Sequence, residues 1–195
     1  FEAVQEFRQK EISGLCVDLV PFSMKYAEDF IRIRNSERSK YFFNQKNNLT
    51  VESQKIWYSN YLSRPNDIFW AILDKSRNFI GTIRLYDIDP EGLILEQGSF
   101  MLDEKIAQTG PYAAEANLMS LDFAFDVLKI KQVINQNRHD NKVMNNLSRK
   151  FGFKFIGLAV LRFMMGNPSS ERILENMKFH ELKEDYKIVS YIYTF

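Results

Sequence analysis

Apolar residues recur along this chain with two spacings, and each spacing predicts one kind of element. Short apolar runs bounded by turn formers predict strands at residues 17–20, 69–73, 80–86, 93–101, 131–137, 153–164 and 187–195. Apolar residues at helical spacing predict helices at residues 23–35, 51–64, 113–128, 142–151 and 169–177. Residues 1–16 are polar and charged, which indicates an N-terminal extension or a loosely attached helix.

The order of these elements defines the expected fold class. Short turns at residues 75–78 and 87–92 join the three central strands, so these strands should be antiparallel neighbours. Helices precede and follow them, which predicts a mixed α/β (α+β) fold with helices flanking a mostly antiparallel central sheet. No stretch of linker composition divides residues 17–195, which we interpret as a single domain with a helical insert at about residues 166–185.

Composition narrows the class of protein. Hydrophobic residues make up 45% of the 195 residues and aromatic residues 14%, which is typical of a globular domain. The 26 basic and 25 acidic residues nearly cancel, so bulk charge favours neither nucleic acid nor an anionic membrane as a partner. Cys16 is the only cysteine, no apolar run reaches the roughly 20 residues that span a bilayer, and no secretory signal opens the sequence. These observations agree with a cytoplasmic protein.

The loop at residues 108–113 is the first candidate for chemistry. It contains Gly110 and Pro111 and leads directly into a predicted helix. Backbone N–H groups at the start of a helix lie at the positive end of its dipole and bind anions such as a pyrophosphate. Such loops are also common as plain turns, so the loop alone leaves both interpretations open.

This loop resembles the coenzyme A loop of the GNAT superfamily of N-acetyltransferases. The family pattern is Gln/Arg-x-x-Gly-x-Gly/Ala, usually followed by a Glu-Ala pair in two of its branches. Here the chain has Gln108, Pro111 and Ala113 at the matching positions, followed by Glu115-Ala116. Pro111 replaces a glycine and has no N–H, so one phosphate donor is missing.

A second motif lies downstream and resembles the family signature Asn-x-x-Ser/Ala-x-x-x-x-x-Lys-x-Gly-Phe. Asn141, Lys150, Gly152 and Phe153 match it, and Met144 stands where a small residue is usual. Asn141 and Gly152 would equally serve to cap and end a helix, and both roles can hold together. Residues 167–179 form a weaker copy, which we interpret as part of the helical insert.

The resemblance implies a GNAT-like fold, in which the mostly antiparallel sheet is splayed, and acetyl-CoA as acyl-donor co-substrate without a metal. It implies that backbone groups at Phe100 to Leu102 contact the pantetheine and thioester, that the loop holds the pyrophosphate, and that Asn141 lies beside the pantetheine arm. The predicted cofactor-binding residues are therefore Phe100, Met101, Leu102, Gln108, Thr109, Gly110, Tyr112, Ala113, Ala114 and Asn141.

Direct transfer to an amine needs a base for the ammonium proton. Glu96 matches an acidic residue that often precedes a glycine on this strand in related enzymes, and it is the first candidate; it could instead face solvent or pair with Arg84. His139 and His180 are weaker candidates. Ser148 stands where many relatives place a tyrosine acid, and it could donate a hydrogen bond to the leaving thiolate. Cys16 has no sequence signature of a nucleophile.

The acceptor is predicted to be a small-molecule amine. The resemblance covers two branches, which acetylate nucleotide-linked amino sugars for surface polysaccharides or the N-termini of proteins, including ribosomal proteins. Upstream signals that resemble the amino-sugar branch are Arg34-Asn35, Thr50-x-Glu52-x-Gln54-x-x-Trp57 and Phe69-Trp70. The aromatic residues Tyr41, Phe42, Phe43 and Trp57 would stack on a sugar or base, or else belong to the core. The alternatives are a protein N-terminal or small-amine acetyltransferase and a non-catalytic acyl-CoA-binding module; a homodimer is compatible with each.

Overall fold

The computed structural model describes residues 2–160 and 187–194, in a mixed α/β fold. The chain divides into two compact units, Phe1–Val133 and Ile134–Thr194, and each unit is described by itself. Within the described ranges, no helix combines the length and the apolar character that crossing a membrane requires. The predicted helical insert at residues 166–185 lies outside the described residues.

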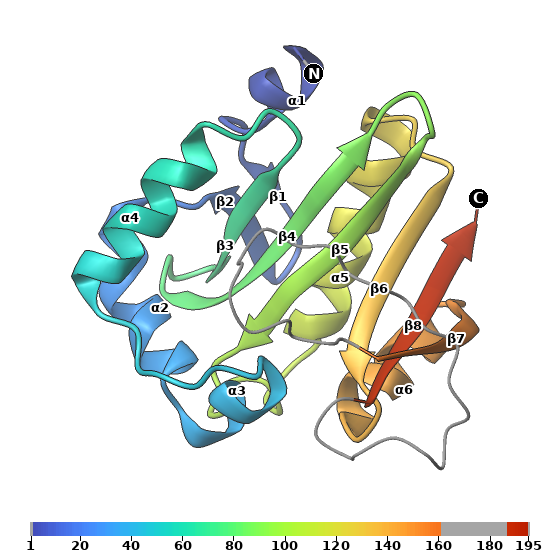
Figure 1. Cartoon of the computed structure of the whole chain (residues 1–195). Helices are drawn as coiled ribbons and strands as arrows, with labels where there is room; N and C mark the ends of the chain where they lie inside the picture. The colour runs from blue at the N-terminus through green and yellow to red at the C-terminus, as the bar shows by residue number, and fades with distance from the viewer. Residues whose placement is uncertain (1, 161–186, 195) are drawn as a thin grey trace. The chain divides into compact units, whose positions relative to one another are not determined.

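The first unit is built on five antiparallel strands that are neighbours in chain order (Figure 1). These strands are β1 (Ile12–Ser13), β2 (Val17–Pro21), β3 (Ile68–Asp74), β4 (Phe79–Asp89) and β5 (Ile94–Leu102). Its helices are α1 (Glu2–Phe7), η1 (Met24–Tyr26), α2 (Ala27–Arg34), α3 (Glu37–Phe42), α4 (Val51–Leu62), α5 (Tyr112–Asp122) and the π-helix η2 (Phe123–Val127). The predicted antiparallel meander is therefore confirmed.

Both faces of this sheet are covered, and β3 shows the division. Consecutive strand residues point to opposite faces. Phe69 packs against Trp57 of α4 at 5.2 Å between ring centroids, whereas the next residue, Trp70, packs edge-on against Phe123 of η2 at 5.2 Å. Helices α2 and α4 therefore cover one face and α5–η2 the other, which explains why β3 is a continuous apolar run buried along almost its whole length.

Two helices differ from the prediction. Helix α3 was not predicted; Ser36 caps it by accepting a hydrogen bond from the Ser39 N–H at 3.2 Å. The helix predicted at 113–128 ends at Asp122 and continues as a π turn. It is also less enclosed than its composition indicated, because Leu118 is 48% exposed and Val127 39%.

The N-terminal segment is held firmly, which corrects the expectation of loose attachment. Val4 is 4% exposed. The Arg8 guanidinium donates to the backbone carbonyl oxygens of Tyr61 at 2.6 Å and Leu62 at 3.3 Å, and it lies 4.3 Å from the centre of the Tyr61 ring. The end of helix α4 is therefore fixed partly by residues that precede the first central strand.

The second unit contains β6 (Gln132–Arg138), which begins at the boundary, α6 (Lys142–Lys150), β7 (Lys154–Val160) and β8 (Lys187–Thr194). Strands β7 and β8 pair antiparallel. Asn141 caps α6, because its side chain accepts from the Met144 N–H at 3.2 Å. Gly152 follows the helix with φ of 84°, a left-handed conformation that glycine adopts without strain. The predicted cap and stop of this helix are confirmed.

Candidate active site

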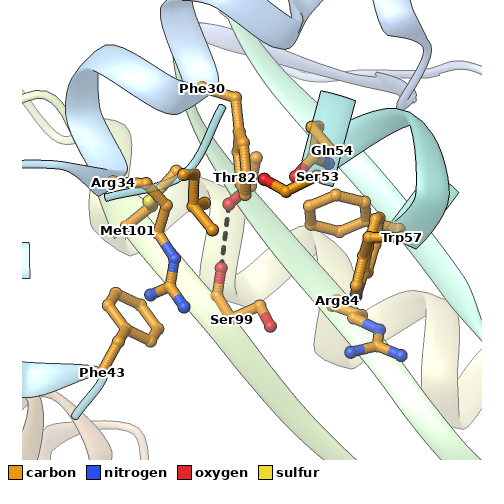
Figure 2. A pocket seen from close by; sticks show the side chains of 12 residues that line it. Phe30, Arg34, Phe43, Ser53, Gln54, Trp57, Thr82, Arg84, Ser99 and Met101 are labelled. Carbon is orange, nitrogen blue, oxygen red and sulfur yellow. Dashed lines mark hydrogen bonds between the residues drawn. The ribbon is translucent and has the colours of Figure 1, made fainter. Parts of the chain in front are cut away.

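A cavity of about 350 Å³ opens on the face of the first unit that carries α2 and α4 (Figure 2). Its apolar lining is Phe30, Phe43, Leu49, Trp57, Phe69 and Met101. Its polar lining is Arg34, Ser53, Gln54, Thr82, Arg84 and Ser99. A concave, largely aromatic wall with a few polar groups is typical of a small-molecule site.

The floor of the cavity contains a bulge in β5. Thr82 and Arg84 of β4 pair with Met101 and Gly98, so Ile83 alone lies opposite two residues. Ser99 has φ of 49°, and its carbonyl accepts a hydrogen bond from the Thr82 hydroxyl at 2.9 Å. Bulges of this kind redirect backbone groups out of the ladder and are frequent beside active sites.

Beyond the bulge, strands β4 and β5 approach each other closely at Gly81. A Cβ atom placed on Gly81 would lie 2.1 Å from the Met101 carbonyl oxygen, so only glycine fits at this position without moving the backbone. The predicted contact residues Phe100 and Leu102 are half-buried here, and Met101 is buried and lines the cavity. The close approach of Gly81 therefore fixes the β5 backbone at Met101, and the contact of these residues with a thioester stays a prediction.

Two arginines lie in the cavity wall, and only one is neutralised. Arg84 forms a bidentate ion pair with Asp67, through Nε at 2.7 Å and through Nη2, and the Asp67 side chain is 2% exposed. Burial alone would lower the pKa of Arg84, but the hydrogen bond and charge of Asp67 outweigh it and raise that pKa. Asp67, which was not considered from the sequence, is therefore the carboxylate that neutralises Arg84.

Arg34 is the second arginine, and it has no such partner. Among the described residues no carboxylate pairs with it, and its Nη1 is buried without a hydrogen-bond acceptor. Burial lowers the pKa of Arg34 to about 10, so the guanidinium stays charged at neutral pH. Its main contact is the Phe43 ring, 3.7 Å from the guanidinium carbon to the ring centre, and Figure 2 shows this pair at one side of the cavity, with Arg84 and Trp57 at the other.

The predicted phosphate loop leads into α5 with free backbone donors. Pro111 occupies the N-cap, and within the described part of the chain the N–H groups of Tyr112, Ala113 and Ala114 have no backbone acceptor. Three such donors at the positive end of an eleven-residue helix fit a pyrophosphate. Pro111 itself supplies no N–H, so Tyr112, Ala113 and Ala114 are the donors that this helix start offers to an anion.

Three further loop residues have different surroundings. Gln108, Thr109 and Gly110 are all exposed. Thr109 uses both its N–H and its hydroxyl to contact the Ile106 carbonyl oxygen, each at 2.9 Å. A Cβ on Gly110 would lie 2.9 Å from the Tyr112 ring, so glycine allows that ring to fold back over the loop.

Glu115 does not face the loop. Its carboxylate accepts backbone N–H groups of Leu15, of Cys16 at 2.7 Å and of Val17 at 3.0 Å. It therefore fixes α5 to the beginning of β2. The Glu-Ala pair that follows the loop motif has a structural role here, since Ala116 is fully buried.

Glu96 lies on the same face of the sheet as the cavity. It pairs with Tyr86 across β4 and β5, and the Tyr86 hydroxyl donates a hydrogen bond to its carboxylate. Tyr86 follows Arg84 on the same side of β4, and the Arg84 guanidinium lies 4.7 Å from the centre of the Tyr86 ring. Glu96 does not line the cavity but is connected to it through these two side chains.

The remaining candidates fall in the second unit. Asn141 is 9% exposed and is engaged as the cap of α6. Ser148 is 4% exposed, and its hydroxyl lies 3.0 Å from the Met144 carbonyl oxygen and 3.4 Å from Asn135 Oδ1. His139 is half-buried, and His180 lies outside the described residues. Across the described ranges, no cluster of three or more His, Cys, Asp or Glu side chains could hold a metal ion.

The upstream sequence signals separate into binding and supporting residues. Arg34, Gln54, Trp57 and Phe69 line the cavity. Asn35 instead holds the loop before α4, because its side chain bonds both the N–H and the carbonyl of Leu49 at 2.7 and 2.9 Å.

Of the four aromatic residues proposed to stack on an acceptor, Phe43 and Trp57 are in the cavity lining, whereas Tyr41 and Phe42 are not. The sequence analysis missed Thr82 and Ser99 altogether and considered Arg84 only as a partner for Glu96. A positive φ at a serine within a strand leaves no composition signal that would have revealed the bulge.

The structure thus combines a bulged strand that lines a cavity with a helix whose first N–H groups can bind an anion. Residues 17–154 match the family model described as the acetyltransferase (GNAT) domain. The chain therefore belongs to the GNAT family and is an N-acetyltransferase.

Solved structures support this assignment at the level of the fold. A GCN5-related N-acetyltransferase from Brucella melitensis is 19% identical, with a TM-score of 0.72 over 95% of this chain and 79% of that one. The spermidine N-acetyltransferase from Vibrio cholerae, solved with CoA and spermine, is 12% identical, with a TM-score of 0.73 over 91% of this chain and 95% of that one. FdhC, a nucleotide-linked sugar GNAT solved in the apo form, is 20% identical, with a TM-score of 0.71 over 95% of this chain and 90% of that one. No curated protein matches the sequence.

Proposed function

We propose that this N-acetyltransferase uses acetyl-CoA to acetylate the primary amine of a nucleotide-linked amino sugar. The observation that carries the proposal is the cavity whose floor is the β5 bulge, because Ser99 and Met101 lie both in the cavity wall and in the strand that leads to the phosphate loop. An amine in this cavity would lie beside the backbone where the thioester is expected.

The donor half rests on backbone groups. The N–H groups of Tyr112, Ala113 and Ala114 would bind the pyrophosphate, with Gln108, Thr109 and Gly110 shaping the loop. Phe100, Met101, Leu102 and Asn141 would contact the pantetheine arm. Bound acetyl-CoA would supply the acetyl thioester, whose C–S bond breaks as the C–N bond to the amine forms.

Proton transfer would involve two side chains. Glu96 would take the ammonium proton through a water, with the Tyr86 hydroxyl orienting its carboxylate. Ser148 would donate a hydrogen bond to the leaving thiolate after its hydroxyl turns away from the Met144 carbonyl. The aromatic wall formed by Phe43 and Trp57 would stack on the sugar or base of the acceptor.

The test is acetyl transfer to a panel of nucleotide-linked amino sugars, followed by mass spectrometry of the products. The proposal expects acetylation of at least one such sugar. Acetylation confined to peptide N-termini would contradict the proposal and indicate a protein as the acceptor. Absence of thiol release with every amine would indicate a non-catalytic acyl-CoA-binding module instead. No observation on the cavity favours either alternative.

A further inference from the structure

We propose that the cavity selects acceptor amines that carry an oxyanion, either a carboxylate or a phosphate, and that Arg34 and Gln54 bind this group. The inference rests on the proposed transfer to an amine and specifies the acceptor's chemistry. It starts from two buried hydrogen-bond donors in the same cavity wall that have no acceptor within the described part of the chain, Arg34 Nη1 and Gln54 Nε2.

Of the buried side-chain donors without an acceptor in the described ranges, these two are the ones that line the cavity. A buried N–H without a partner costs free energy, so folded proteins almost always satisfy such groups. Gln54 lies in α4 and is 3% exposed, and Arg34 is the last residue of α2. Both donors line the space that an acceptor would fill, so an acceptor oxygen is the natural partner for each.

The charge of the cavity lining decides which kind of oxygen the two donors would bind. Its lining contains no Asp or Glu. Arg84 is already neutralised by Asp67, which leaves the Arg34 guanidinium as the uncompensated charge of the lining. A guanidinium binds carboxylates and phosphates with paired N–H groups, and its position over Phe43 fixes the plane in which it can do so. The cavity therefore favours an anion and disfavours a polycation.

This result separates the chain from polyamine acetylation. A polyamine needs carboxylates or other acceptors to replace the water around its ammonium groups. The cavity instead presents a cation and amide N–H donors. Likeness of fold to a spermidine N-acetyltransferase at 12% identity does not change that local chemistry.

The first experiment compares acceptors that share one amine. Thiol release from acetyl-CoA is measured with glucosamine, glucosamine 1-phosphate, muramic acid and spermidine. We expect kcat/KM for the phosphate or the carboxylate acceptor to exceed that for glucosamine and for spermidine by at least tenfold, and the better of the two identifies the oxyanion. Equal efficiency with glucosamine, or a preference for spermidine, overturns the inference while leaving amine acetylation established.

Variants assign the effect to the two side chains. Arg34→Met keeps the packing on Phe43 and removes the charge, so KM for the anionic acceptor should rise at least tenfold and the preference for that acceptor over spermidine should shrink. Arg38→Gln, at an exposed arginine of α3, is the matched control and should change neither KM nor this preference. Arg34→Lys, which keeps a charge but not the planar pair of N–H donors, and Gln54→Met should each give a smaller rise in KM. An unchanged KM in both Arg34 variants overturns the inference.

A binding measurement remains informative even if no amine in the panel is acetylated. Coenzyme A is added first so that phosphate does not bind at the start of α5, and inorganic phosphate is then titrated while Tm is followed. We expect phosphate to raise the Tm of the wild type and of Arg38→Gln but not of Arg34→Met or Gln54→Met. Equal shifts in all four proteins overturn the inference independently of catalysis.

Discussion

The Thr82 hydroxyl donates a hydrogen bond to the Ser99 carbonyl oxygen, 2.9 Å away, at the point where β5 bulges. Thr82 is fully buried, and the bulge removes Ser99 from the regular ladder. This side chain therefore supplies the partner that the β4 backbone does not, and it stabilises the conformation that the cavity floor depends on.

Replacing Thr82 by valine should loosen this floor. Valine has the same shape but leaves the Ser99 carbonyl without its donor, which should cost about 1 to 3 kcal/mol of unfolding free energy. Urea unfolding measures the loss, and kcat/KM should fall as well. Thr82→Ser is the control, because it keeps the hydroxyl; a serine variant as impaired as the valine variant would contradict this role.

Replacing Asp67 by asparagine should leave Arg84 buried and uncompensated. Loss of one partner of a buried ion pair typically costs about 3 to 5 kcal/mol. The matched control is Arg64→Gln, because Arg64 contacts the same carboxylate at 3.5 Å but is 47% exposed. That variant should lose less than about 1 kcal/mol. Chemical unfolding measures the free energy that each variant loses, and equal losses would contradict the role of Asp67 as the partner that neutralises Arg84.

Replacing Glu115 by alanine should detach α5 from β2. Its carboxylate accepts hydrogen bonds from three backbone N–H groups, and one hydrogen bond to a charged group contributes about 1.5 to 3 kcal/mol, so a loss of at least about 3 kcal/mol is expected. Thermal unfolding measures it. Glu104→Ala, at an exposed position in the loop before α5, should stay within about 0.5 kcal/mol of the wild type.

Replacing Glu96 by glutamine should lower kcat about 100-fold if the carboxylate takes the ammonium proton. If Glu96 is the base, activity of the wild type should fall on acidification and this fall should disappear in the variant, whereas a purely structural role would lower activity at every pH alike. Tyr86→Phe keeps the carboxylate and removes the hydrogen bond to it, so a smaller fall is expected. Retention of full activity in Glu96→Gln would exclude this base.

Replacing Arg32 by glutamine should change the acid stability of the loop that follows β5. Burial would raise the pKa of Asp103, but hydrogen bonds from Arg32 at 2.7 Å and from the Lys105 N–H outweigh it and place that pKa below its usual value of 3.8. A lowered carboxylate pKa stabilises the folded state above pH 3.8, and this contribution is lost as the pH falls through the folded pKa. Arg32 is half-exposed, so the variant should lose less than about 1 kcal/mol at pH 7, and the difference should shrink as the pH falls below 3.8. A difference that grows on acidification would contradict the ion pair.

The local sequence pattern predicted an element correctly where one spacing of apolar residues dominates or a capping residue marks the start of a helix. The apolar run of β3, the Thr50 cap of α4 and the Asn141 cap of α6 follow from residue type and position, and each is confirmed. Helix α3 was missed because its six mostly polar residues have no apolar period, and only the capping residue Ser36 indicates a helix there. The π turn was missed because π and α helices share the same apolar pattern.

The candidate site was predictable where its residues fall in short motifs. The loop before α5 is contiguous in sequence, and the upstream motifs include Arg34 and Gln54, which line the cavity. The sequence did not show that Ser99, on a third element, lies in the same cavity, because no spacing relates it to the other two residues. Whether Arg84 has a partner likewise depends on Asp67, which folding brings to it from the preceding strand connection.

The hydrogen bonds of Glu115 to residues 15–17 also link two distant parts of the chain. Leu15 and Glu115 are 100 residues apart, so the contact closes a long loop, and pairing of the intervening strands lowers the entropy cost of closing it. Hydrogen exchange at the amides of residues 15–17 therefore reports, from the far end of the chain, whether the donor loop is in place.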